Sequence, residues 1–160
     1  MKKILAMAMA MTLSMALVFT GCSSEKKEDT AKKPQTEQKA SEENKYQYYT
    51  ADQVKDIVEN NKPAIILDVQ VKEDYDKHHI KGAIPTYAYP AKTAEDTAKL
   101  DASLDKLKAS NDPIVVVCPG GAGGATRSID YLKTKGIDEN RLFILEKGQK
   151  EWPYDNLLEK

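Results

Sequence analysis

The chain has 160 residues, of which 31% are charged and 7% aromatic, and its formal net charge is −1. Eight of the 24 Lys and Arg residues and six of the 25 Asp and Glu residues precede residue 46, so residues 46–160 carry 16 basic and 19 acidic side chains. This near balance, without a basic stripe, argues against nucleic acid as a partner. Residues 46–160 have the length of one globular domain.

Residues 1–21 have the pattern of a secretory signal peptide. Two lysines precede an apolar run from Ile4 to Phe19, and small residues follow. A lone membrane helix is the alternative, but it needs about 20 apolar residues, and hydroxyl residues interrupt this shorter run. The end of the segment, VFTGC, resembles the lipobox of bacterial lipoproteins, with Phe19 where leucine is usual. The resemblance implies a lipid on Cys22 and a membrane-anchored, extracytoplasmic protein; cleavage that leaves Cys22 a plain thiol is the alternative.

The segment 22–45 is predicted to be a disordered, charged tether. After Cys22 it has no aromatic residue and no aliphatic residue larger than alanine, and its six lysines balance six acidic residues. Such a segment cannot bury enough apolar surface to fold. We interpret it as a solvated linker between the anchor and the domain at 46–160.

The domain alternates helical and strand patterns. A capping box at Thr50 predicts a helix over 51–60, and a capped segment from Thr93 continues through a stripe of leucines at 100, 104 and 107. A third helix is expected over 126–135, closed by Gly136. Apolar runs at 64–69, 114–117 and 142–145 predict buried parallel strands. The sequence therefore predicts an α/β fold with a parallel sheet flanked by helices on both faces.

The stretch VVVCPGGAGGATRS, residues 115–128, joins a strand to a helix through a glycine-rich loop. A nucleotide site is one interpretation, but no lysine is present for a phosphate-binding GxxxxGK loop. The dinucleotide pattern GxGxxG is also incomplete, because Thr126 stands at its third glycine. Nucleotide binding is therefore disfavoured.

A nucleophilic role for Cys118 explains the same stretch better than nucleotide binding does. A thiol at a strand end, before small residues and a helix N-terminus, lies near unpaired N–H groups and the positive end of the helix dipole. Those groups would stabilise a thiolate, which is the nucleophilic form. If Cys22 is acylated, Cys118 has no disulfide partner within the chain, so chemical use is favoured over a role as a buried core residue.

Three motifs then make residues 46–153 resemble a rhodanese domain. They are the strand end Asp68-Val69-Gln70 with Asp74-Tyr75 and the turn HHIKGA at 78–83, the loop that starts at Cys118 and ends at Arg127-Ser128, and the closing pattern Gly148-Gln149-Lys150-Glu151-Trp152. Gln70 stands where the family has arginine, so a neutral hydrogen bond to Asp74 is expected in place of an ion pair. The family's loop runs CxxxxR, and we expect a loop four residues longer here.

The resemblance implies a sulfurtransferase without metal or organic cofactor. Cys118 would attack a small anionic sulfur donor such as thiosulfate or polysulfide, hold sulfane sulfur as a persulfide, and pass it to a thiol or cyanide-like acceptor. Arg127 would support the donor or fix the loop. The expected cradle consists of Pro119, Gly120, Gly121, Ala122, Gly123, Gly124, Ala125, Thr126 and Arg127.

Two alternatives remain open for the domain. One is a rhodanese-like binding or sensing module that turns over negligibly, and the other is a cysteine phosphatase or arsenate reductase whose longer loop admits a tetrahedral anion. His78 and His79 are not expected to bind metal, since adjacent side chains point apart and the chain has no third histidine. Trp152 is expected to be a core or lid residue.

Overall fold

A computed structural model describes residues 45–160 of the chain. The predicted signal peptide, Cys22 and the tether up to residue 44 lie outside the described residues. Five parallel strands form the central sheet in the order β1-β6-β5-β2-β4, and β3 and β7 form a separate antiparallel pair. The strands are β1 (Gln47–Tyr49), β2 (Ile65–Asp68), β3 (His79–Ile80), β4 (Ile84–Pro85), β5 (Ile114–Val117), β6 (Leu142–Leu145) and β7 (Leu158–Glu159).

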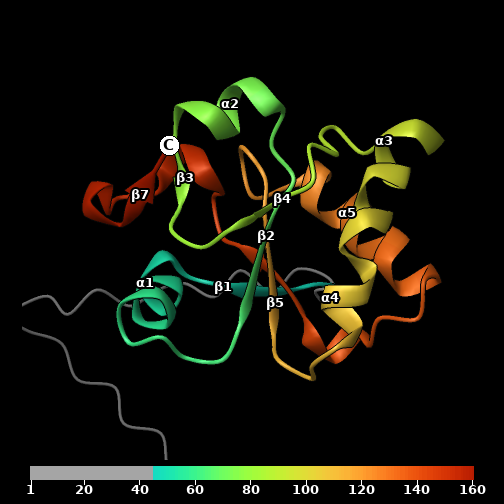
Figure 1. Ribbon diagram of the computed structural model, residues 1–160, viewed down its shortest axis with the longest axis horizontal. Coiled ribbons are helices and arrows are strands. Elements are labelled where there is room, and N and C mark those ends of the chain that lie inside the picture. Colours follow the sequence, from blue (N-terminus) through green and yellow to red (C-terminus); the bar gives the residue numbers. More distant parts are fainter. Residues whose placement is uncertain (1–44) are drawn as a thin grey trace, which may run out of the picture. The chain divides into compact units, whose positions relative to one another are not determined.

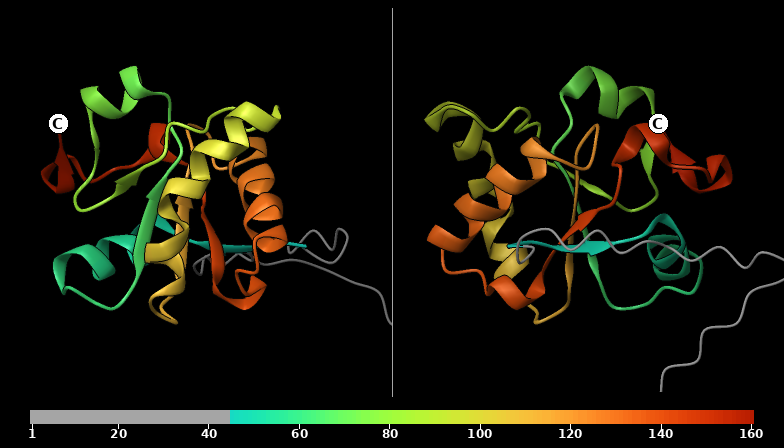
Figure 2. Two further views of the ribbon diagram at one scale, coloured as in Figure 1. Left: turned by 45° about the vertical axis from the view of Figure 1, so that its right-hand side comes forward. Right: turned by 180° about the vertical axis from the view of Figure 1, so that it is seen from behind.

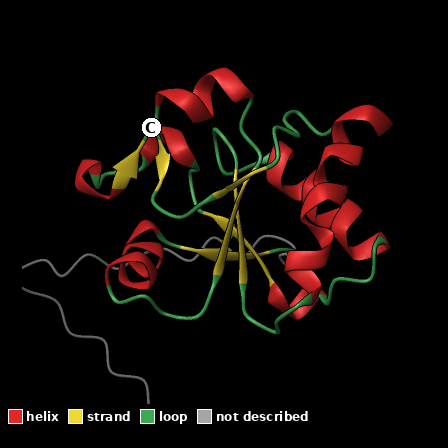
Figure 3. Cartoon of the chain, viewed as in Figure 1, coloured by secondary structure: helices red, strands yellow, loops and turns green. Residues whose placement is uncertain are grey.

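Helices cover both faces of the sheet (Figure 1). The α-helices are α1 (Ala51–Glu59), α2 (Lys72–Lys77), α3 (Ala94–Ala98), α4 (Leu104–Lys108) and α5 (Gly123–Thr134), and the 3₁₀ turns are η1 (Lys99–Ser103), η2 (Glu139–Arg141), η3 (Gln149–Glu151) and η4 (Asp155–Leu157). Figure 2 shows α4 and α5 together on one side of the sheet, and α1 with the C-terminal segment on the other. Figure 3 shows the central strands, in yellow, between these two sets of helices. The predicted α/β fold class is confirmed.

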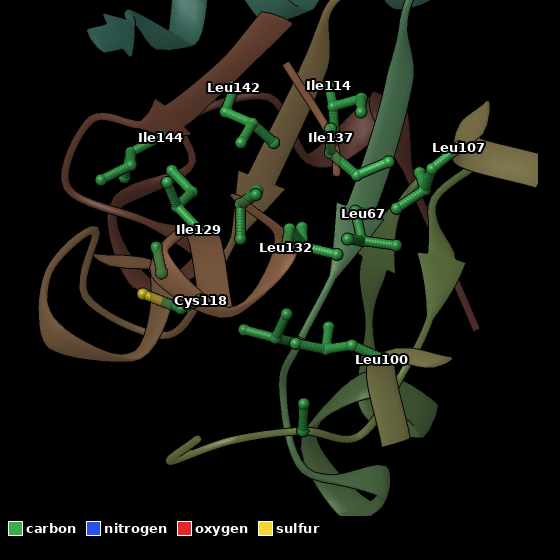
Figure 4. Packing of buried hydrophobic residues seen from close by; sticks show 14 residues of the cluster. Leu67, Leu100, Leu107, Ile114, Cys118, Ile129, Leu132, Ile137, Leu142 and Ile144 are labelled. Carbon is green, nitrogen blue, oxygen red and sulfur yellow. The ribbon is translucent and has the colours of Figure 1, made fainter. Parts of the chain in front are cut away.

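Two hydrophobic clusters fill the two layers. One packs Leu67, Ile114 and Leu132 between the sheet and the α4–α5 side (Figure 4). The other packs Val54, Val117 and Trp152 beneath α1 and the C-terminal segment. Successive residues of β5 alternate between the clusters, as side chains on a strand do. Trp152 is 7% exposed and is a core residue, as expected.

Local signals explain where the helices begin and end. At α1 the Thr50 hydroxyl accepts from the Gln53 amide at 3.2 Å, and the Gln53 side chain accepts from the Thr50 amide at 2.8 Å, which is the predicted capping box. At the end of α5, Gly136 adopts a left-handed φ of 84°, as a helix-closing glycine does. These two ends were predictable from short-range patterns.

Two predictions about helices need correction. The segment after Thr93 is not one helix, because it divides into α3, η1 and α4, with Leu100 and Leu107 buried and Leu104 only half-buried. The helix expected over 126–135 begins three residues earlier, at Gly123. Glycine is a weak helix former, so the pattern alone favours loop there, but packing against the core overrides propensity.

Candidate functional site

Cys118 follows β5 directly, at the carboxyl end of a central strand. The loop after it is short, because α5 already begins at Gly123. The expectation of a loop that extends to Arg127 is therefore wrong: Arg127 lies inside α5, one turn beyond the helix start. Figure 4 places the sulfur of Cys118 at the edge of its cluster, beside this loop. The residue is 2% exposed and forms no disulfide in the described structure.

The start of α5 has no side-chain cap. Its N-cap residue is Ala122, which has no side-chain acceptor, and only the amides of Ala125 and Thr126 bond back to the Ala122 carbonyl. Within residues 45–160, no acceptor bonds the N–H groups of Gly120, Gly121, Ala122, Gly123 and Gly124. Free N–H groups at a helix N-terminus can bind an anion through backbone dipoles. The Cys118 Sγ itself lies 4.0 Å from the Ala122 carbonyl oxygen, in the same loop. The role of residues 119–127 as a cradle for a substrate stays a prediction.

The segment after β6 holds this loop in place. The amide of Gln149 donates to the Cys118 carbonyl at 2.9 Å, and the amide of Lys150 donates to the Pro119 carbonyl at 3.1 Å. Gly121 and Gly148 pack backbone against backbone: a Cβ on Gly148 would lie 2.2 Å from the Cys118 carbonyl oxygen and 2.3 Å from the Gly121 nitrogen. Both glycines have positive φ, 63° and 67°. The loop and the closing motif therefore form one interlocked unit.

The segment around Tyr89 lies on the other side of the loop. A Cβ on Gly124 would meet the Tyr89 ring at 2.7 Å and the Cβ of Cys118 at 3.4 Å, so the ring lies against the helix start beside the thiol. The Tyr89 amide donates to the Val69 carbonyl at 2.7 Å, which ties the segment to the end of β2. Neither Tyr89 nor the role of this segment was anticipated, because no spacing pattern links it to Cys118.

Arg127 fastens that segment. Its Nε and Nη2 donate to the Pro90 carbonyl at 3.0 and 2.8 Å. Its Nη1 lies over Gly123, at 2.7 Å from the position of a Cβ there, and makes no hydrogen bond to the described residues. Arg127 thus contacts the segment at Pro90 and forms no hydrogen bond to the loop at 118–122. The expected role of fixing the loop stays a prediction. Binding of a donor by Arg127 stays a prediction.

At the end of β2, the hydrogen-bond partner of Gln70 differs from the expected one. Gln70 bonds Asp68 through its amide at 2.8 Å and through Nε2 at 3.0 Å, and no bond joins it to Asp74. The prediction of a Gln70–Asp74 hydrogen bond is therefore wrong, because the Gln70 carboxamide donates to the buried carboxylate of Asp68 instead. Burial raises the pKa of Asp68 to about 6, against the lowering effect of the Gln70 bonds.

The two histidines point apart. His79 is buried, stacks on Tyr75 with ring centroids 3.7 Å apart, and its Nδ1 lies 3.0 Å from the Tyr75 carbonyl oxygen. His78 is exposed. No group of three His, Cys, Asp or Glu side chains that could hold a metal occurs in the described part of the chain. Nor does that part contain a helix long and apolar enough to cross a membrane.

The described structure thus combines a parallel α/β sheet with a cysteine, a glycine-rich loop and an uncapped helix start at the end of a central strand. The model of the rhodanese-like domain matches residues 50–154. The chain therefore belongs to the rhodanese-like domain family, which covers sulfurtransferases, phosphatases and reductases. No curated protein matches the sequence.

Solved structures agree with this assignment. A rhodanese-like domain from Anabaena sp. is 26% identical, with a TM-score of 0.53, over 70% of this chain and 77% of that one. The As–Sb reductase of Leishmania major is 20% identical (TM-score 0.52; 71% and 84% covered). A yeast protein tyrosine phosphatase of the rhodanese family is 18% identical (TM-score 0.53; 73% and 93% covered). The last two share the fold, and their identities carry no further inference about activity.

Proposed function

We propose that this protein is a sulfurtransferase that carries sulfane sulfur on Cys118. The observation that carries the proposal is the set of free N–H groups at 120–124, in the loop and helix start that directly follow a thiol that is 2% exposed. Backbone dipoles stabilise the anionic sulfur without requiring a cationic side chain in the loop. A persulfide adds a single atom to the thiol, so it suits a nucleophile with little free space around it.

The reaction has two displacements. The Cys118 thiolate attacks the outer sulfur of thiosulfate or polysulfide; a Cys118–sulfur bond forms, the donor's sulfur–sulfur bond breaks, and the leaving group departs with the electron pair. An acceptor thiolate or cyanide then attacks the outer sulfur of the persulfide, and Cys118 leaves as a thiolate. No redox cofactor is needed, because each step exchanges one bond to sulfur for another.

A phosphatase or arsenate reductase is the second candidate, because the rhodanese-like family covers phosphatases and reductases as well as sulfurtransferases. Arg127 weighs against it. Two of its three nitrogens already donate to the Pro90 carbonyl, so a two-pronged grip on a tetrahedral dianion is not available without rearrangement. A binding module with negligible turnover is the third candidate.

Steady-state assays on the purified domain separate these candidates. Thiosulfate and polysulfide with cyanide or a thiol acceptor should give turnover that is lost in Cys118→Ser. Phosphoester and arsenate should give none. Turnover of phosphoester or arsenate alone would overturn the proposal, and failure with all four substrates would favour the binding module.

We also propose that the mature protein is attached to the bacterial cell membrane, on its extracytoplasmic face, through a lipid on Cys22. The proposal rests on the sequence VFTGC after an apolar leader. Cys22→Ser should move the protein from the membrane fraction to a soluble or unprocessed form. A variant that stays fully acylated and membrane-bound would contradict it.

A further inference from the structure

A cavity of about 450 Å³ lies at the edge of the sheet, at the amino end of β2. One wall comes from the last turn of α1 and another from Lys106 of α4, and these two helices cover opposite faces of the sheet (Figure 2). A single cavity can touch both helices only where the sheet between them ends. The start of β2 and the turn between β3 and β4 complete the walls. The proposed sulfur chemistry uses none of these residues.

The strand β4 covers only part of β2 at this edge. It pairs with the last two residues of β2, whereas β5, on the other side, pairs with all four. The Ile65 amide donates to the Pro113 carbonyl on the β5 side at 2.8 Å. Because backbone polar groups alternate between the two sides of a strand, those of Ala64 and Ile66 face the side of β4. The N–H and C=O of Ala64 have no hydrogen-bond partner among residues 45–160. The cavity therefore contains a short open sheet edge, which can pair with an extended chain.

Apolar side chains flank this open edge on both faces. Ile57 and Val58 belong to the layer under α1, and Ile65 and Ile84 to the layer under α4 and α5. All four are half-buried, so each leaves apolar surface uncovered. The side chains of an extended segment point alternately to the two faces. A strand added at this edge would therefore remove apolar surface from water on both sides.

The rim of the cavity is basic. Its lining contains three lysines and no acidic residue. Lys62 is paired with Asp56, but Lys81 and Lys106 are exposed and form no ion pair in the described part of the chain. The complementary charge is negative, so an acidic occupant is favoured over a neutral or basic one. The open edge favours a peptide over an anionic lipid, because a peptide supplies N–H and C=O groups at strand spacing.

We propose that this cavity docks an extended, acidic segment of a partner protein, which adds a strand to the open edge of β2. The segment pairs with the backbone at 64–66, packs apolar side chains against the flanking isoleucines and valine, and places carboxylates near Lys81 and Lys106. The proposal does not depend on sulfur transfer. The cavity lies at the amino end of β2 and Cys118 at the carboxyl end of β5, a parallel neighbour, so the two sites can be occupied together.

Fluorescence anisotropy of labelled peptides on the purified protein tests the proposal. The probe is the peptide EVEVE, which alternates acidic and apolar residues. In the matched peptides, KVKVK reverses the charge, ESESE removes the apolar side chains, and EVEVE with N-methylated backbone amides loses its hydrogen-bond donors. EVEVE should bind about tenfold or more tightly than each of the other three.

The other outcomes overturn the proposal in different ways. Equal affinity for EVEVE and its N-methylated form would exclude strand addition. No binding of EVEVE would leave the lysines as groups that only keep the edge from pairing. Binding to phosphatidylglycerol vesicles without binding of EVEVE would assign the lysines to a membrane surface instead.

Two variants of α4 locate the binding. Lys106→Glu should weaken EVEVE binding about tenfold. Lys108→Glu is the matched control, because Lys108 is also exposed and lies on the same helix but does not line the cavity. Hydrogen exchange at the amides of Ala64 and Ile66 should slow when EVEVE is bound, which a purely electrostatic contact would not cause. Equal affinity in the two variants, or no slowing at either amide, would contradict the assignment.

Discussion

The guanidinium of Arg127 holds the carbonyl oxygen of Pro90 with two hydrogen bonds of 3.0 and 2.8 Å, and so joins the first turns of α5 to the segment that contains Tyr89. Hydrogen bonds from a charged donor each contribute about 1.5–3 kcal/mol to stability. The pair thus positions the residues beside Cys118 as well as stabilising the domain.

Arg127→Ala should speed alkylation of Cys118 by a bulky maleimide, because the segment at 89–90 is released. Arg141→Ala is the matched control. Arg141 also donates through Nε and Nη2, to the carbonyls of Asp112 and Leu107, each at 2.9 Å, but away from the cysteine. Both variants should lose similar stability in urea unfolding, yet only Arg127→Ala should react faster. Equal alkylation rates in the two would show that Arg127 acts on stability alone.

Tyr89→Ala should enlarge access to the thiol, since the ring lies against Gly124 next to Cys118. We expect alkylation by a bulky reagent to rise more than alkylation by iodoacetamide. Tyr48→Ala serves as the control, because Tyr48 is 42% exposed and does not contact the site. If the two reagents gain equally, the ring does not limit access by size.

Substitution of Gly121, which packs against Gly148, tests whether the backbone N–H groups of the loop take part in sulfur transfer. Gly121→Ala should lower sulfur transfer about 100-fold or more, because the Cβ would lie 2.5 Å from the Lys147 nitrogen and φ is 63°. Gly120→Ala is the control, since a Cβ there meets nothing within 4 Å. Circular dichroism checks that both variants fold. Wild-type transfer rates in folded Gly121→Ala would show that the N–H cradle does not take part.

Asp68 should make stability depend on pH. Burial raises its folded pKa from 3.8 to about 6, so the folded state binds more protons than the unfolded state between these values. The free energy of unfolding should therefore fall as pH rises from about 4 to 6, by about 3 kcal/mol at most. Asp68→Asn should remove this fall, as measured by urea unfolding from pH 4 to 7. The same slope in wild type and variant would contradict the assignment.

The fold was predictable because its signals are local and strong. Apolar runs marked β2, β5 and β6, and the hydroxyls of Thr50 and Thr93 marked helix starts. The start of α5 was misplaced because Gly123 and Gly124 oppose helix formation, whereas contact with Tyr89 and Cys118 decides the outcome. The strands β3 and β4 have only two residues each, which is too short for a periodic pattern to reveal them in the sequence.

The candidate site was predictable in part. Cys118 could be singled out because it follows a predicted strand and precedes a run of glycines, and this pattern is visible in the sequence alone. The roles of Tyr89 and Pro90 depend on a contact between residues 37 positions apart. The bond between Gln70 and Asp68 depends on which of two nearby carboxylates is buried. Such choices follow from three-dimensional packing and leave no spacing in the sequence.

Mass spectrometry of the peptide that contains Cys118 tests the central claim most directly. After exposure of the folded protein to thiosulfate or polysulfide, the peptide should gain the mass of one sulfur atom, and a thiol or cyanide should then remove it. Cys118→Ser protein should show no gain. A wild-type peptide that stays unmodified while the protein remains folded would contradict the account, as would a gain that no acceptor can remove.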